Sequence, residues 1–219
     1  IRKAAELIEG ANPDRIITIG GNCIVSQAPF DYLHGRYKNV GLLWIDAHPD
    51  VSTPDDGYPN AHAMVLGALL GHGDDELAGL LEHGPFSPDQ VLYVGLQGLH
   101  AYQEQTLQNL GVDYTVQTEQ FVSMEAIRTF LSRFDHILVH FDIDVMDPAF
   151  FHSTYFANPE LVGDGSGGGR MSMEELSVIL KYLCSESDVV GLTIAEYLPF
   201  DEHRLRKVFE GIGLFTADS

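Results

Sequence analysis

Acidic residues and one histidine gather at three places in the sequence, each where an apolar run ends. The members of these groups are Asp46, His48, Asp50, Asp142, Asp144 and Glu196. Residues two apart on an extended segment point to the same side, so the side chains of the first two groups can converge. Several carboxylates in one pocket cannot all stay ionised without a counter-charge. One or two divalent cations would supply it, and an oxygen-rich site with one imidazole suits Mn²⁺, with Fe²⁺, Co²⁺ or Zn²⁺ as competitors.

A single aspartate after a strand also has an ordinary structural explanation. It is more often a turn residue or a helix cap than a metal ligand. A lone Asp-x-His or Asp-x-Asp arises by chance in an acidic chain. Three acidic groups, each at the end of a buried run, are harder to explain as solvated loops. The pattern therefore favours a metal site.

Short apolar runs alternate with helical patterns along the whole chain. Strands are expected at Arg15–Ile19, Val40–Ile45, Gln90–Gly95, Val112–Val116, His136–Asp142 and Val189–Ile194. The β-branched run of the first one predicts that it is buried. Helices are expected around residues 4–8, 62–71, 101–110, 123–133, 172–184 and 202–215. This alternation predicts one α/β domain over residues 1–219, with three αβα layers and a mainly parallel central sheet. Ligands of such sheets bind at the carboxyl ends of the strands, where the acidic groups lie.

Two segments carry further local information. The glycine-rich stretch 163–169 is expected to form a flexible surface loop near the site. The first residues already follow a helical pattern, and we expect that an N-terminal segment precedes Ile1 in the whole protein.

The composition narrows the classes of function. The chain has 219 residues with 12 Lys and Arg against 32 Asp and Glu, a net charge of -20. Such a surface repels phosphate backbones and anionic lipid, which argues against nucleic-acid and membrane-surface roles. No apolar run approaches the ~20 residues that span a bilayer. Two cysteines form no disulfide framework, so a reducing cytoplasm is the simplest setting.

Four motifs together resemble one enzyme family. The segment Asp46–Asp50 (DAHPD) resembles the DAHxD motif of the ureohydrolases, which include arginases, agmatinases and formimidoylglutamases. The segment Phe141–Pro148 (FDIDVMDP) is similar to the second signature of that family, xDxDxxDP. Gly20–Cys23 stands in the place of its GGDH motif, and Ala195–Pro199 in that of its late glutamate segment. Order and spacing agree from about Ile16 to Pro199.

The resemblance implies an arginase-like fold and a binuclear Mn²⁺ centre with a metal-bridged hydroxide. That hydroxide would attack the trigonal carbon of a small guanidino or amidine substrate, with release of urea. By resemblance, Asp46 and Asp142 would bridge the metals, Cys23 and Asp50 would complete one, and His48 and Asp144 the other. Glu196 matches the glutamate that binds the guanidinium, and His62 matches a histidine that shuttles protons. Family members assemble as trimers or hexamers, so a homo-oligomer is implied by resemblance alone.

Cys23 departs from the family, whose first ligand is a histidine. A thiolate is a softer ligand and favours Zn²⁺, Fe²⁺ or Co²⁺ over Mn²⁺. The alternative is a buried thiol that packs as a small hydrophobe and binds nothing, which would weaken or remove one metal.

The substrate contacts also differ from those of arginases. Ser52 stands where arginases carry an asparagine that contacts the amino-acid end of the substrate, although capping a turn is a commoner role for a serine. A carboxylate that arginases place near Gly98 is missing. The sequence therefore predicts the reaction class but leaves arginine, agmatine and other amidines open as substrates.

Two other functions remain as alternatives. The first is a non-catalytic or single-metal relative that acts as a sensor or an assembly subunit, and Cys23 motivates it. The second is hydrolysis of an acylated amine around one Zn²⁺, against which the full DAHxD pattern argues. His140 alternates with Asp142 along a predicted strand, so it either lines the pocket or packs in the core.

Overall fold

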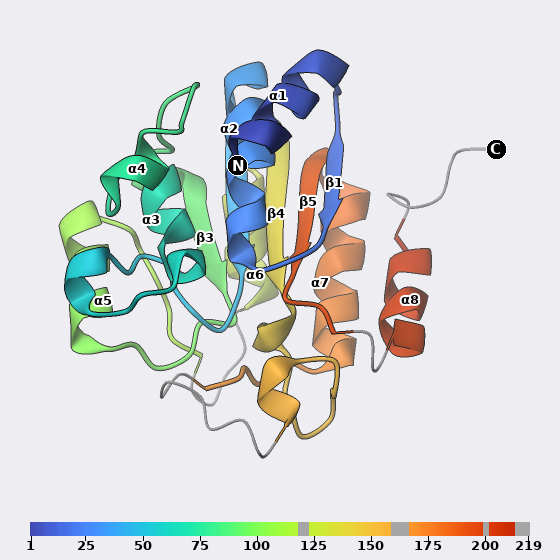
Figure 1. Cartoon of the computed structure of the whole chain (residues 1–219). Helices are drawn as coiled ribbons and strands as arrows, with labels where there is room; N and C mark the ends of the chain where they lie inside the picture. The colour runs from blue at the N-terminus through green and yellow to red at the C-terminus, as the bar shows by residue number, and fades with distance from the viewer. Residues whose placement is uncertain (118–122, 159–166, 199–201, 213–219) are drawn as a thin grey trace.

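A computed structural model describes residues 1–117, 123–158, 167–198 and 202–212. Within them, five parallel strands form one sheet in the order β1-β5-β4-β2-β3 (Figure 1). The strands are β1 (Ile16–Ile19), β2 (Val40–Ile45), β3 (Val91–Val94), β4 (His136–Asp142) and β5 (Val189–Ala195). Parallel pairing places the carboxyl ends of all five strands at the same edge. Residues from distant parts of the chain can therefore meet at the carboxyl ends of the strands, which we call the carboxyl edge of the sheet.

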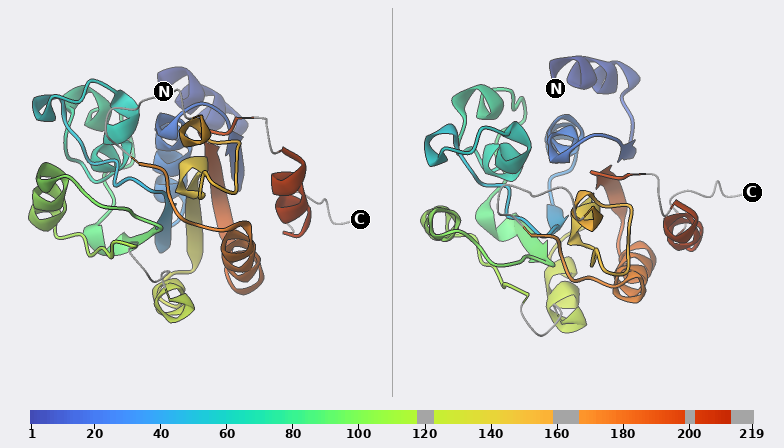
Figure 2. Two further views of the ribbon diagram at one scale, coloured as in Figure 1. Left: turned by 90° about the horizontal axis from the view of Figure 1, so that it is seen from below. Right: turned by 60° about the horizontal axis from the view of Figure 1, so that its bottom comes forward.

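Helices cover both faces of this sheet, as seen from two directions in Figure 2. The helices are α1 (Arg2–Ala11), α2 (Gln27–Arg36), α3 (Val65–Leu69), α4 (Asp75–Ala78), α5 (Ala101–Leu110), α6 (Met124–Leu131), α7 (Met173–Glu186) and α8 (Glu202–Glu210). Leu42 and Trp44 of β2 pack against the side of α2, α3 and α5, whereas Leu43 and Ile45 pack against the side of α6, α7 and α8. Successive side chains of β2 thus enter two apolar cores, one on each face of the sheet, which confirms the expected three-layer αβα fold.

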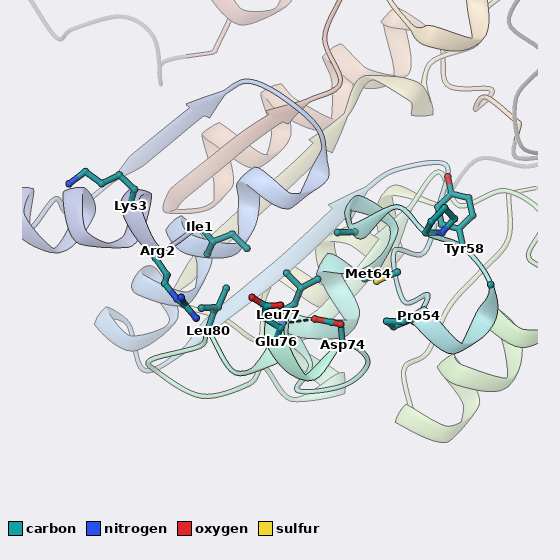
Figure 3. Close-up of a pocket in the computed structure, with 13 residues that line it drawn as sticks. Ile1, Arg2, Lys3, Pro54, Tyr58, Met64, Asp74, Glu76, Leu77 and Leu80 are labelled. Atoms are coloured by element: carbon teal, nitrogen blue, oxygen red, sulfur yellow. Dashed lines mark hydrogen bonds between the residues drawn. The ribbon is translucent and has the colours of Figure 1, made fainter.

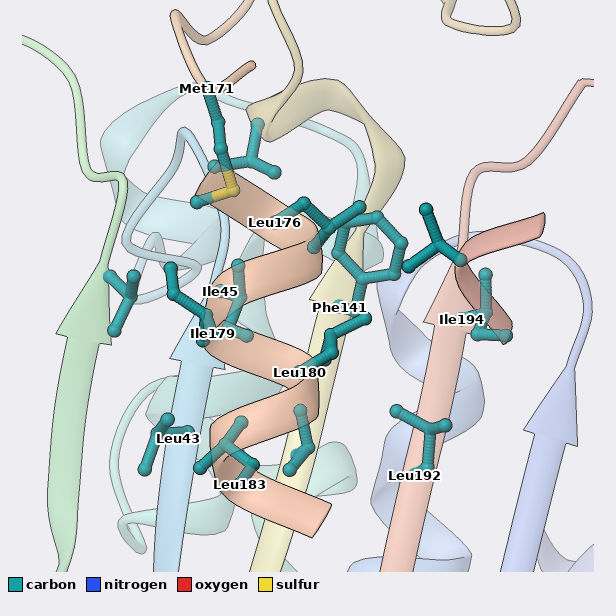
Figure 4. Close-up of a cluster of buried hydrophobic side chains, with 14 of the residues drawn as sticks. Leu43, Ile45, Phe141, Met171, Leu176, Ile179, Leu180, Leu183, Leu192 and Ile194 are labelled. Atoms are coloured by element: carbon teal, nitrogen blue, oxygen red, sulfur yellow. The ribbon is translucent and has the colours of Figure 1, made fainter. Parts of the chain in front are cut away.

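Helix α7 shows how local sequence fixes one covering layer. Ser172 accepts a hydrogen bond from the Glu175 amide (3.2 Å), and the Glu175 carboxylate accepts one from the Ser172 amide (2.8 Å). This capping box satisfies amide groups that the first helical turn leaves unpaired. Leu176, Ile179 and Leu180 then lie on the buried face of the helix, over the sheet (Figure 4).

Two expectations about strands are wrong. Residues 112–116 form irregular structure instead of a strand: Val112 is buried against the core, but these residues join no ladder. The first strand is present but not buried, because the sheet order places β1 at an edge. Its Ile17 and Ile19 are 40% and 60% exposed, respectively. The β-propensity of the residues predicts an extended segment, but the position of that strand in the sheet determines how much of it is buried.

Other expected elements are confirmed with shifted bounds. The helix expected at 62–71 is a short 3-10 turn, Ala61–Met64, followed by α3. The last helix ends at Glu210, and residues 213–215 lie outside the described residues, as do 163–166 of the glycine-rich stretch. No helix in the described part of the chain is long and apolar enough to span a membrane.

The packing of α7 gives a stability prediction. Ile179 is 1% exposed, and its neighbour Val178 is 51% exposed on the same helix. We expect Ile179→Ala to lower the free energy of unfolding by about 2–5 kcal/mol, because it removes buried methyl groups and leaves a cavity. The matched change Val178→Ala is expected to alter it by no more than about 0.5 kcal/mol. Urea unfolding measures both, and equal losses would contradict the assigned core face.

Candidate metal centre

Four aspartates are buried together at the carboxyl edge of the sheet. Asp46 follows β2 directly and Asp50 lies in the loop after it; Asp142 ends β4 and Asp144 lies in the 3-10 turn Ile143–Val145 that follows. None of the four is more than 3% exposed. Glu196, directly after β5, completes the acidic group and is partly buried. The structure therefore brings together the three acidic groups that lie far apart in the sequence.

Backbone turns fix the direction of these carboxylates. Asp46 Oδ1 accepts a hydrogen bond from the His48 amide (2.7 Å), and Asp142 Oδ1 accepts one from the Asp144 amide (2.8 Å). The Trp44 indole donates to the other oxygen of Asp46, Oδ2, at 3.0 Å. Strands β2 and β4 thus lead into Asp46 and Asp142, whose side chains are held by backbone amides two residues further on.

One side of the cluster contains His48. Its Nδ1 lies 2.9 Å from Asp144 Oδ2 and 3.6 Å from Asp46 Oδ1. The possible ligand atoms of these three residues all lie within 4.8 Å of one another, so one cation could contact all of them.

The other side of the cluster contains Cys23, at the start of the 3-10 turn Cys23–Ser26 that Asn22 caps. The Cys23 Sγ lies 2.9 Å from Asp142 Oδ2 and 3.9 Å from Glu196 Oε1. A further compact group joins Cys23 with Asp46, Asp50 and His140, again with ligand atoms within 4.8 Å of one another. The structure places Cys23, 4% exposed, between the carboxylates on one side and the apolar core on the side of α2 on the other.

Two site residues adopt a backbone conformation that side chains rarely take. Asp50 and Glu196 have φ angles of 51° and 58°, in the left-handed region. Backbone hydrogen bonds hold both: the Gly67 amide donates to the Asp50 carbonyl (2.9 Å), and the Glu196 amide donates to the Gly21 carbonyl (2.7 Å). Such conformations concentrate at functional sites, where the surrounding structure enforces them.

Burial and mutual repulsion shift the pKa values of the cluster. Burial, followed by the charges of Asp144 and Asp46, raises the pKa of Glu196 to about 7. Burial and the neighbouring carboxylates raise the pKa values of Asp50 and Asp142 well above their usual range. For His48, burial alone would lower the pKa, but the Asp144 carboxylate and its hydrogen bond, together with Asp46, raise it to about 10. A positive charge at the centre of the cluster would therefore stabilise the ionised carboxylates.

The residues present fit divalent metal ions. They offer carboxylate oxygens, imidazole nitrogens and one thiol, which are the ordinary ligands of Mn²⁺, Fe²⁺, Co²⁺ and Zn²⁺. Asp50 Oδ2 is buried and has no hydrogen-bond partner among the described residues. A buried polar atom in that state is costly, and a cation beside it would satisfy it.

A cavity of about 590 Å³ opens onto this cluster. Its lining includes Cys23, His48, Asp50, Asp144 and Glu196, together with Ser52, His62, Tyr102, Tyr155, Phe156 and Gly167. His62 thus faces the cavity, but it belongs to none of the ligand groups found in the described residues. Ser52 lies 1% exposed, with its hydroxyl 3.2 Å from that of Tyr102. Asp46 and Asp142 lie deeper, below the lining.

A second hollow of about 730 Å³ lies between the start of the chain and α4 (Figure 3). Its acidic residues have structural roles or ordinary surroundings: Asp74 caps α4 by accepting a hydrogen bond from the Leu77 amide (2.8 Å). The remaining lining is mostly apolar, including Ile1, Met64 and Leu80. The larger hollow is therefore not the chemical site, because it lacks convergent ligands.

Comparison with known proteins assigns the family. The model of the Arginase family matches residues 2–209. The chain is 28% identical over 199 residues to an arginase of Entamoeba histolytica, covering 87% of this chain and 64% of that protein. It is 25% identical over 207 residues to an agmatinase of Halalkalibacterium halodurans, covering 90% and 63%. The chain thus spans less than two-thirds of the length of these relatives.

Solved structures agree on the fold. The crystal structure of the Entamoeba histolytica arginase in complex with L-ornithine matches with a TM-score of 0.79 at 24% identity, over 97% of this chain and 74% of that one. A formimidoylglutamase of Bacillus subtilis matches with a TM-score of 0.69 at 17% identity, over 96% and 64%. The fold and the carboxylate edge define a three-layer α/β protein with a candidate metal centre. The chain belongs to the arginase family.

Some features of the site are not evident from sequence reasoning. Trp44 looks like a packing residue, yet its indole also holds Asp46. Phe156 looks like part of a loop, yet it lines the cavity with its ring 5.9 Å from that of His48. Tyr102, the partner of Ser52, comes from α5, far along the chain. Only the apolar and aromatic character of these residues was visible in the sequence, which does not distinguish core from cavity wall.

The raised pKa values give a prediction for pH dependence. A group whose pKa is higher in the folded than in the unfolded protein stabilises the fold fully at pH below its unfolded pKa. That stabilisation is lost as the pH rises toward its folded pKa. The stabilising contribution of His48 is therefore lost between pH 6.5 and about 10, and that of Glu196 between pH 4.5 and about 7. Burial lowers the pKa of His140 to about 3, so its contribution is lost in the opposite direction, as the pH falls below 6.5. We therefore expect the metal-free protein to lose stability steadily above pH 6.5.

Thermal unfolding of chelator-treated protein between pH 6.5 and 9.5 measures this loss. Added Mn²⁺ or Zn²⁺ should offset it, because the ligands bind metal in their deprotonated forms. A metal-free protein whose stability is flat or rises over this range would contradict the electrostatic description of the cluster.

Proposed function

We propose that this protein is a metal-dependent hydrolase of C–N bonds in linear guanidines or amidines, arginase- or agmatinase-like and urea-releasing. The observation that carries the proposal is the convergence of Cys23, His48, four buried aspartates and Glu196 at the floor of one cavity. Membership in the arginase family supports the reaction class.

The ligand groups on the two sides of the cluster would hold two divalent cations, Mn²⁺ by family resemblance or Zn²⁺, Fe²⁺ or Co²⁺ if Cys23 binds as a thiolate. Bound cations would supply an activated water as the nucleophile at neutral pH. Asp46 belongs to ligand groups on both sides of the cluster and is the first candidate for a shared ligand. Asp142, on the neighbouring strand, belongs to a group with Cys23 and Glu196 and accepts from the Asp144 amide, so it is the second candidate, by family resemblance.

Glu196 is suited to bind the planar cationic end of the substrate. Its carboxylate lies beside Cys23 and lines the cavity, and a carboxylate can pair with a guanidinium through two parallel hydrogen bonds. The left-handed backbone at Glu196 fixes the direction of its side chain after β5. The trigonal carbon would therefore be presented to the acidic floor in one orientation.

His62 and Ser52 would act farther from the floor. His62 faces the cavity from the 3-10 turn Ala61–Met64, and an imidazole can give a proton to a leaving amine. Ser52, paired with Tyr102, offers hydroxyl groups to the far end of a substrate. These hydroxyl groups suit agmatine, or a neutral substrate tail, at least as well as an amino acid.

Cys23 also supports a second candidate function, a relative that holds one cation and performs no hydrolysis. Burial, followed by the charge of Asp142, raises the pKa of the Cys23 thiol well above its usual value. A thiol that stays protonated would donate to Asp142 instead of binding metal. The two functions differ in the number of ions bound and in turnover.

The first test removes one ligand. Asp144→Asn keeps the shape of the side chain but should lower urea release from arginine, agmatine or a related guanidine by at least about 100-fold, since even outer-shell changes at metal sites cost 10–100-fold. Asp135→Asn, at the exposed opposite end of β4, is the matched control and should leave turnover unchanged. Urea release that survives Asp144→Asn would show that the site is assigned incorrectly.

The second test exchanges the thiol. If the hydrolase function is correct, wild-type protein releases urea, and Cys23→His shifts its preference from Zn²⁺ or Co²⁺ toward Mn²⁺, because imidazole is a harder ligand than thiolate. Urea release is measured after dialysis against each metal. An inactive wild type combined with Mn²⁺-dependent activity in Cys23→His would favour the non-catalytic relative instead.

A further inference from the structure

His140 occupies an unusual position for a core histidine. It lies on β4 two residues before Asp142 and is 0% exposed. Its ring stacks on that of Trp44 with centroids 3.6 Å apart and an interplanar angle of 7°. Its Nδ1 lies 2.8 Å from the Ser26 hydroxyl. Its Nε2 is buried, has no hydrogen-bond partner among the described residues, and lies 3.5 Å from Asp46 Oδ2.

Neither tautomer of His140 satisfies this arrangement without a further group. If Nδ1 donates to Ser26, the Nε2 lone pair faces the Asp46 carboxylate, and two acceptors oppose each other in a dry environment. If Ser26 donates to Nδ1, the Nε2–H reaches Asp46 only at 3.5 Å, beyond the usual range of a hydrogen bond. A buried polar atom left in either state costs free energy. A cation between Nε2 and the carboxylate resolves the first arrangement.

The surroundings of His140 match those of a metal-binding histidine. Such residues donate their second ring nitrogen to an oxygen, which fixes the tautomer and the ring direction, and Ser26 is in place for that role. The atoms of Cys23, Asp46, Asp50 and His140 that can bind metal all lie within 4.8 Å of one another, and all four residues are buried. Trp44 fixes the ring plane from one side.

We propose that His140 Nε2 is a ligand of the cation on the Cys23 side of the cluster, together with Cys23, Asp46 and Asp50. This inference rests on the proposed metal-dependent function. The imidazole of that ion then comes from strand β4, and the thiolate comes from the turn at Cys23. One thiolate, one imidazole and two carboxylates form a softer ligand set than carboxylates with imidazole alone, which favours Zn²⁺ or Co²⁺ on this side.

The alternative is that His140 packs in the core and binds nothing. His140→Phe distinguishes the two, because phenylalanine can keep the stack on Trp44 while removing both ring nitrogens. His34→Phe is the matched control: His34 also stacks on an aromatic ring, Phe86, at 4.0 Å, but lies away from the ligand groups. Both variants are compared with wild type after loading with Co²⁺.

Two measurements that do not depend on activity then test the inference. Metal content per chain should fall from two ions in wild type and His34→Phe to one in His140→Phe. In proton NMR of the Co²⁺-loaded protein, each bound imidazole gives a shifted exchangeable N–H signal, so His48 and His140 should give two signals and His140→Phe only one. Retention of two ions and both signals in His140→Phe would overturn the inference but not the proposed function.

Wild-type protein provides a test even if His140→Phe does not fold. Selective isotope labelling of histidine identifies the shifted N–H signals, and the His140 signal should resist solvent exchange because Ser26 and the core shield it. Two bound Co²⁺ ions with a single shifted imidazole signal would overturn the role of His140. A wild type that binds no ion would overturn the proposed function as well.

Discussion

The structure depends on one electrostatic constraint, the burial of four aspartates within a few ångströms of each other. An ionised carboxylate is expensive to remove from water, and its neighbours of like charge add to that cost. The loop amides and the Trp44 indole offset part of it, as each of Asp46 and Asp142 accepts at least one backbone hydrogen bond. These neutral donors leave the net negative charge in place. Protons reduce this charge in part, because the pKa values of His48, Asp50 and Asp142 are raised. Divalent cations compensate it without protonating the ligands, and the proposed chemistry uses the same ions.

The rest of the fold holds these carboxylates in place. Parallel strands in register bring the ends of β2, β4 and β5 to one edge, and two apolar layers prevent the strands from shifting. The left-handed backbone at Asp50 and Glu196 costs about 1–3 kcal/mol at each position. Backbone hydrogen bonds to α3 and to the loop before Cys23 offset that cost. The apolar packing around α7 therefore also compensates for the conformational cost of the backbone at Asp50 and Glu196.

Sequence reasoning predicts most of this architecture because the signals are local. Apolar alternation identifies the five strands, and the motifs at Asp46 and Asp142 identify the edge. Strand order is not local: the sequence of β1 contains nothing that shows it lies at an edge, so the exposure of Ile19 was not foreseen. Residues 112–116 have the composition of a strand but no neighbouring strand to pair with, and tertiary context decides against them.

The same limit applies to the site. The acidic residues are recognisable because their spacing is periodic, whereas His140 looks ambiguous until the positions of its neighbours are known. Three separate segments define its environment: Trp44 stacks on its ring, Ser26 contacts one nitrogen, and Asp46 faces the other.

Residues 23 and 140 therefore have to be interpreted as a pair. In isolation, a cysteine at the first ligand position reads as a lost imidazole, and a histidine inside a sheet reads as a packing residue. Once the structure places both beside Asp46 and Asp50, the imidazole is present but comes from a different segment of the chain. A ring held between a tryptophan and a serine on a central strand is more rigid than one on a short turn. Rigid ligands select among metals by geometry as well as by softness. The departure of Cys23 from the family pattern is then consistent with a complete ligand set of altered composition.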